Sequence, residues 1–150
     1  MKLAAPLVLA TALAGLSGCG SLDSAPAPLA GDLLSAPTAL NFKGQLLRLD
    51  ATPRLSGETF GVKVRLHTSR APIPRVRPLN VYVVTGGGVW DAPYRKDAAP
   101  TCGRTACVSG QARGSGEGVL NGESVQVVVQ LKDEQGRLFW LRDAQARVGR

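Results

Sequence analysis

Apolar and polar side chains alternate along much of the chain after about residue 40. The pattern is clearest in Thr59–Thr68, where three aliphatic residues alternate with two cations and a histidine: Val62, Val64 and Leu66 with Lys63, Arg65 and His67. Successive side chains of a β-strand point to opposite faces of the sheet. The pattern therefore predicts a strand whose aliphatic face is buried and whose charged face is exposed.

Other segments with similar alternation, bounded by turn-forming residues, predict further strands. They are residues 45–50, 79–85, 89–94, 106–113, 124–132, 137–142 and 144–148. In 124–132 we expect Val127 and Val129 to be buried, and Gln126 and Gln130 to be largely exposed. Pro93 interrupts 89–94, which predicts a strand at the edge of a sheet.

No segment in this part of the chain shows the sustained 3.6-residue period of a helix. About seven or eight short strands separated by polar turns predict an all-β fold, a single small antiparallel β-sandwich. In strand number and spacing the chain resembles an immunoglobulin-like or fibronectin type III-like module. A small closed β-barrel is the alternative.

The N-terminal residues have a different pattern. An uncharged apolar run follows Lys2 and ends at Leu16-Ser17-Gly18-Cys19. At about 14 residues it is shorter than the about 20 that a membrane-spanning helix needs, and its organisation is typical of a signal peptide. The last four residues resemble the lipobox of bacterial lipoproteins. That resemblance implies cleavage before Cys19, a diacylglycerol on its thiol and an acyl chain such as palmitate on its amine. An ordinary secretory signal is the alternative.

These patterns divide the chain into three parts. We expect a lipoprotein signal peptide at 1–18, the lipidated Cys19 with a flexible tether at 19–40, and the β-sandwich at 41–150. The tether is predicted from its richness in Ala, Pro, Ser and Gly. The resemblance implies a lipid anchor in the cell envelope. In a bacterium with two membranes, Gly20 in place of Asp favours the outer membrane over the inner one.

The other two cysteines are close together in the sequence. Cys102 and Cys107 flank four residues that include a glycine. Opposed residues of a hairpin can bring their Cβ atoms within disulfide range, and an exported chain is in an oxidising environment. We therefore predict a structural disulfide. A zinc or redox site is disfavoured because the spacing is not Cys-x-x-Cys and His67 is the only histidine.

The composition is basic, with 18 Lys and Arg against 11 Asp and Glu and a formal charge of +7. This balance suits an anionic partner, although a solvated arginine-rich surface is the simpler interpretation. We expect no nucleic acid partner, because the chain is exported and no stacking aromatic residues are interleaved with the cations.

Two neighbouring segments are candidates for binding. Residues 71–78 contain three prolines and two arginines, Arg75 and Arg77, and follow directly after Arg70. This composition indicates either a stiff basic arm or an irregular crossover between strands. Farther along, two aromatic residues stand near two cations, a combination that can bind sugar rings or protein partners, although Trp90 also suits the core. The candidate binding residues are Arg70, Arg75, Arg77, Trp90, Tyr94, Arg95 and Lys96.

We find no catalytic or metal-binding constellation. As a general base, His67 would need a nucleophile such as Ser56, Ser69 or Ser109 beside it, and nothing in the sequence places one there. Gly86-Gly87-Gly88 is followed by an extended segment, so it predicts a hairpin turn and not a phosphate-binding loop.

The sequence therefore predicts a non-catalytic binding or structural domain without cofactors. Its expected partners are the membrane, through the lipid anchor, and an anionic envelope component or envelope protein. The alternatives are an inhibitor or accessory subunit of an envelope enzyme, and a small hydrolase.

Overall fold

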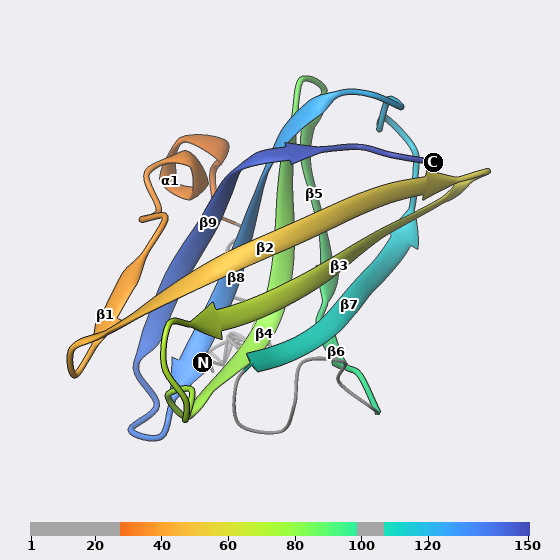
Figure 1. The fold of residues 1–150 in the computed structure, drawn as a ribbon. Coiled ribbons are helices and arrows are strands. Elements are labelled where there is room, and N and C mark those ends of the chain that lie inside the picture. Colours follow the sequence, from red (N-terminus) through yellow and green to blue (C-terminus); the bar gives the residue numbers. More distant parts are fainter. Residues whose placement is uncertain (1–27, 99–106) are drawn as a thin grey trace, which may run out of the picture.

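The computed structural model describes residues 28–98 and 107–150. Two antiparallel sheets pack face to face, with strand orders β1-β2-β3-β7-β6 and β5-β4-β8-β9 (Figure 1). The prediction of a small all-β sandwich is confirmed. The elements are α1 (Ala30–Leu34), β1 (Leu40–Phe42), β2 (Gln45–Ser56), β3 (Thr59–Thr68), β4 (Val76–Thr85), β5 (Gly88–Pro93), β6 (Arg95–Lys96), β7 (Cys107–Ser115), β8 (Ser124–Asp133) and β9 (Leu138–Arg147).

Strand β3 is at the centre of the five-stranded sheet, between β2 and β7. Its bounds and its alternation match the prediction: Val62, Val64 and Leu66 are buried, whereas Lys63 and Arg65 are exposed. The register is continuous with both neighbours along the strand. The charged face of β3 is consequently part of one outer surface shared by β2, β3 and β7.

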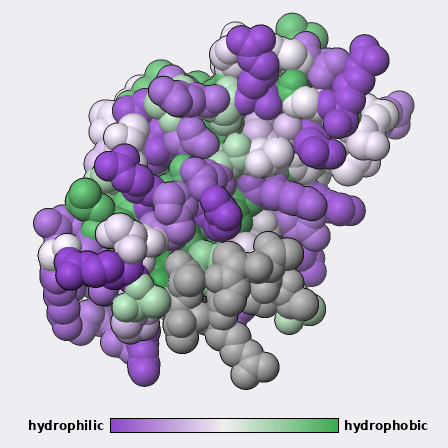
Figure 2. Space-filling view, in the orientation of Figure 1, coloured by the Kyte–Doolittle hydropathy of each residue, from purple (hydrophilic) through white to green (hydrophobic). Residues whose placement is uncertain are grey.

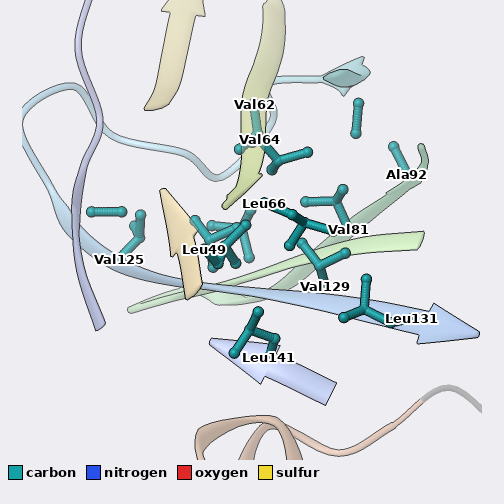
Figure 3. Packing of buried hydrophobic residues seen from close by; sticks show 14 of the residues in the cluster. Leu49, Val62, Val64, Leu66, Val81, Ala92, Val125, Val129, Leu131 and Leu141 are labelled. Atoms are coloured by element: carbon teal, nitrogen blue, oxygen red, sulfur yellow. The ribbon is translucent and has the colours of Figure 1, made fainter. Parts of the chain in front are cut away.

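The core lies between the two sheets and is almost entirely aliphatic. Figure 3 shows side chains from both sheets converging there, including Leu49 of β2, Val64 of β3, Val81 of β4, Val129 of β8 and Leu141 of β9. Each has at most 5% of its surface exposed. Burial of such side chains contributes roughly 1.5–3 kcal/mol each and makes the sheets a rigid support for the outer surfaces.

The four-stranded sheet is covered on its outer face as well. Val127, Val128 and Val129 are all fully buried although adjacent residues face opposite sides. The cover comes from α1, whose Leu33 packs in a second cluster with Tyr82 and Val128. The prediction that residues 19–40 form a flexible tether is therefore wrong for its last part, which forms a helix on the sandwich.

The same cover affects the glutamines of β8. Gln126 and Gln130 are partly buried, not largely exposed as predicted. Gln126 accepts a hydrogen bond from the guanidinium of Arg142. Arg142 also donates from Nε to the Ala36 carbonyl at 2.9 Å, and its amide donates to the Pro37 carbonyl at 2.9 Å. These bonds attach the segment after α1 to the outer face.

Strand lengths differ from the prediction at the prolines. β2 continues past residue 50 and includes Pro53, which pairs with Val62 of β3 at a point beyond the pairing with β1. β4 begins before residue 79 and includes Pro78 at a register irregularity opposite β8. Proline is tolerated in strands at edges and irregularities, because no ladder hydrogen bond is lost there. β5 is an edge strand, as Pro93 predicted.

The C-terminal segment runs beside β2. Gly149 forms a parallel bridge with Arg54, and the amide of Leu55 donates to the Gly149 carbonyl at 2.8 Å. This contact places Arg150 next to the outer surface of the five-stranded sheet.

Candidate functional site

The predicted basic segment lies at one end of the sandwich. Arg70 and Arg75 are exposed in the β3–β4 connection, and Arg77 is exposed on β4. The connection, the β1–β2 turn and the β8–β9 turn border a groove of about 420 Å³. Half-buried Phe42 and Ile73 line its apolar part.

The charges of this groove are largely matched within it. Arg75 Nη1 lies 3.3 Å from Glu134 Oε1, and Arg137 Nε lies 2.7 Å from Asp133 Oδ2. Burial opposes ionisation of Asp133, but hydrogen bonds from the amide and guanidinium of Arg137 outweigh it and lower the pKa of that carboxyl. The acid–base pairs organise the turn and reduce the positive field of the groove.

The aromatic candidates belong largely to the packing of the sandwich. Trp90 is half-buried, packs edge-on against Phe60 at 4.8 Å between centroids, and donates from Nε1 to the Ser115 carbonyl at 2.8 Å. Tyr94 is also half-buried against the core, and burial raises its pKa to about 12. Its hydroxyl has no hydrogen-bond partner within the part of the chain that the structure describes.

The seven candidate residues are divided between the two sheets. Arg70, Arg75 and Arg77 lie in or beside the β3–β4 connection, whereas Arg95 and Lys96 form β6 at the edge of the five-stranded sheet. Arg95 is in register with Gln111 of β7. The geometry therefore associates β6 with the outer face of β2, β3 and β7.

That outer face is the more basic surface. Hydrophilic side chains predominate over β2, β3 and β7 in Figure 2. Arg54 of β2, Gly61 of β3 and Arg113 of β7 are direct cross-strand neighbours. Two residues farther along β3 on the same face, Lys63 lies between Thr52 of β2 and Gln111 of β7. Directly opposed residues of an antiparallel sheet share a face, so three cations surround a position that has no side chain.

A groove of about 460 Å³ lies at this position, and Gly61 is among its lining residues. No carboxylate side chain is among the residues that line it. In residues 28–98 and 107–150 the ion pairs are formed by other cations, which leaves Arg54, Lys63 and Arg113 without an acidic partner there. The lining side chains are those of Thr52, Arg54, Ser56, Thr59, Val62, Lys63, Gln111, Arg113 and Arg150.

A single carboxylate, that of Asp50, balances charges nearer the other end of β3. Asp50 Oδ2 lies 2.8 Å from Arg65 Nη2 and 3.1 Å from His67 Nε2. The hydrogen bond from Arg65, together with the neighbouring His67, outweighs partial burial and lowers the pKa of Asp50. The unbalanced positive charge is thus concentrated at the Gly61 end.

Among residues 28–98 and 107–150, no nucleophile is hydrogen-bonded to His67. The buried hydroxyl of Ser109, on the neighbouring strand, has no hydrogen-bond partner among the described residues. Within the same residues, no three His, Cys, Asp or Glu side chains are grouped so as to hold a metal ion. In the described part of the chain, no helix is long and apolar enough to span a membrane.

Cys19 and Cys102 lie outside the described residues, so the lipidation and disulfide predictions remain predictions. Cys107 is buried at the start of β7, in register with His67. No protein-family model, curated protein or solved structure matches this chain.

Proposed function

We propose that this chain is a lipid-anchored protein of the bacterial cell envelope whose β-sandwich is a non-catalytic domain that binds an anionic envelope component. Support for the anchor comes from the lipobox-like Leu16-Ser17-Gly18-Cys19 after a short apolar run. Two or three lipid chains on one cysteine hold a protein stably at a membrane. A Cys102–Cys107 disulfide belongs to the same proposal, because exported domains are oxidised.

The observation that supports binding is the surplus of unpaired cations on the outer face of β2, β3 and β7. Arg54, Lys63 and Arg113 project from paired strands in the five-stranded sheet, so their backbones are held in fixed positions. No acidic side chain lines the space between them. Such a surface attracts anions, whereas the β3–β4 connection has its arginine charge partly balanced by Glu134.

Two triple variants of the full chain test this proposal. One replaces Arg54, Lys63 and Arg113 by Ala, and the other replaces Arg70, Arg75 and Arg77 by Ala. Each removes three positive charges, so the two have the same net charge. Binding is measured by co-sedimentation with protein-free envelope fragments in a neutral detergent at increasing salt.

We expect the first variant to lose most of the binding and the second to retain most of it. Wild-type binding should weaken as salt increases, since exposed charges are screened within about 10 Å at 0.1 M. Equal binding by both variants and the wild type, or binding insensitive to salt, would contradict an electrostatic role for this face.

A further inference from the structure

Gly61 is an unusual residue for its position in the strand. It lies within the longest regular pairing of the five-stranded sheet, between buried Phe60 and Val62. Glycine weakens a strand, and inside one it often marks a bulge or a close approach by another group. The register on both sides of Gly61 is continuous, which excludes a bulge.

Packing does not require this glycine. A Cβ atom at Gly61 would meet only Arg113 Cγ at 3.6 Å and the Ala112 carbonyl oxygen at 3.7 Å, which are ordinary contacts. Gly110 on β7 differs, because a Cβ there would collide with the Tyr94 ring. The fold thus explains Gly110 but leaves Gly61 unexplained, and the feature that Gly61 provides is the space between Arg54 and Arg113.

The groups around this space are hydrogen-bond donors with positive charge. The Cα atoms of Arg54 and Arg113 are two strand spacings apart, about 10 Å, so long side chains from both sides can reach one small ligand between them. Guanidinium groups bind oxyanions through two parallel hydrogen bonds, and Lys63 adds an ammonium. Three residues with hydroxyl groups, Thr52, Ser56 and Thr59, also line the groove.

We propose that the hollow at Gly61 is a binding site for a phosphate group, with Arg54 and Arg113 on either side and Lys63 along the strand. Arg150 also lines the groove, so four cations and no carboxylate side chain surround it, and such a set matches a dianion better than a monoanion. A phosphate monoester has about −1.5 to −2 charges and three acceptor oxygens, more than one carboxylate has. The proposal rests on the proposed anion-binding function and specifies the group that is recognised.

The test is calorimetric titration of the full chain, in neutral detergent at low salt, with sodium pyrophosphate and, for comparison, sodium citrate, a carboxylate anion of similar charge. We expect Arg54→Ala and Arg113→Ala each to raise the Kd for pyrophosphate about tenfold, the effect of losing a charge-assisted hydrogen bond. Gly61→Val, which places a branched side chain between Arg54 and Arg113 without changing charge, should weaken binding to a similar extent. Citrate should bind more weakly than pyrophosphate.

Arg48→Ala is the matched control, because Arg48 is exposed on the same strand as Arg54 but does not line the groove. The Kd of Arg48→Ala for pyrophosphate should change by less than about twofold, because this variant alters only the general positive field of the surface. Circular dichroism verifies folding of each variant, and Gly61→Ala provides a smaller substitution that ordinary contacts tolerate.

Equal losses for Arg48→Ala and Arg54→Ala, or equal binding of citrate, would overturn the phosphate site while leaving a basic face that binds anions. Absence of pyrophosphate binding combined with normal envelope binding would overturn the phosphate site but not the proposed function. Loss of both types of binding in the wild type would contradict the proposed function itself.

The phosphate group can belong to a lipid headgroup or to a free phosphate compound. Lipids added to the detergent micelles distinguish these two sources. If lipid headgroups supply the ligand, micelles with phosphatidic acid, whose headgroup is a phosphate monoester, should weaken pyrophosphate binding. Micelles with phosphatidylcholine, a zwitterionic phosphodiester, should not. If a free phosphate compound is the ligand, neither lipid should compete. Either result supports the phosphate site and identifies its source.

Discussion

Replacement of Leu33 by Ala tests whether α1 is part of the folded domain. Leu33 is only 1% exposed and packs against the outer face of the four-stranded sheet with Tyr82 and Val128. The substitution removes three buried carbons at about 0.8 kcal/mol each, about 2.4 kcal/mol. A residual cavity adds to this, and because α1 is at the surface and can settle, we expect a total loss of about 3 kcal/mol.

Urea unfolding of the full chain measures this loss. With a slope of about 2 kcal/mol per molar urea, the midpoint should fall by about 1.5 M. Leu34→Ala is the control, because it makes the same chemical change in the same helix at a residue that is 41% exposed. Its effect should remain below about 1 kcal/mol. Equal midpoints for the two variants would refute the docking of α1 and extend the flexible tether to residue 40.

Four further predictions concern the anchor, the cysteines and two titrating groups. Cys19→Ser should abolish lipidation and release the mature chain into soluble fractions; an unmodified N-terminus in native protein, found by mass spectrometry, would contradict the anchor. Reduction of the Cys102–Cys107 pair should lower the Tm by a few degrees with an unchanged β-type circular dichroism spectrum, since a short loop gives a small entropic gain; free thiols in envelope-purified protein would exclude the bond. Tyr94→Phe should preserve or raise stability by removing a buried hydroxyl that lacks a described partner. Because the pKa of Tyr94 is raised from 10.0 to about 12, its contribution to stability is lost as pH rises across that range. In thermal melts the Tm of the wild type should therefore fall more than that of Tyr94→Phe. For Asp133 the pKa is lowered from 3.8, so its contribution is present above that value and is lost as pH falls through the lower one. The Tm difference between wild type and Asp133→Asn should then narrow below about pH 4, and a constant difference would argue against this role.

Alternation along single strands was sufficient to predict most of the sheet residues. In Thr59–Thr68 one face is apolar and the other charged, so the period of two identifies both the strand and its buried side. In β8 the same reasoning was less accurate for Gln126 and Gln130, because the second face is also covered. The cover comes from α1, whose five residues are too few to produce a helical period.

The basic groove depends on information that the linear sequence does not contain. Arg54, Gly61 and Arg113 become neighbours only when β2 and β7 pair with opposite edges of β3 in the observed register. Pro53 also concealed the second half of β2, since a proline usually ends a strand prediction. The available signal was Gly61 itself, a glycine inside the most regular strand of the chain.

The most direct test of the binding surface is amide NMR of the full, isotope-labelled chain during titration with pyrophosphate. We predict that the largest chemical-shift changes occur at Gly61, Lys63 and Arg113. Changes should also occur at Arg54 and Thr52, the β2 residues paired with Gly61 and Lys63. Changes centred on Arg70, Arg75 and Arg77, or spread evenly over the exposed cations, would contradict the assignment of anion binding to the outer face of β2, β3 and β7.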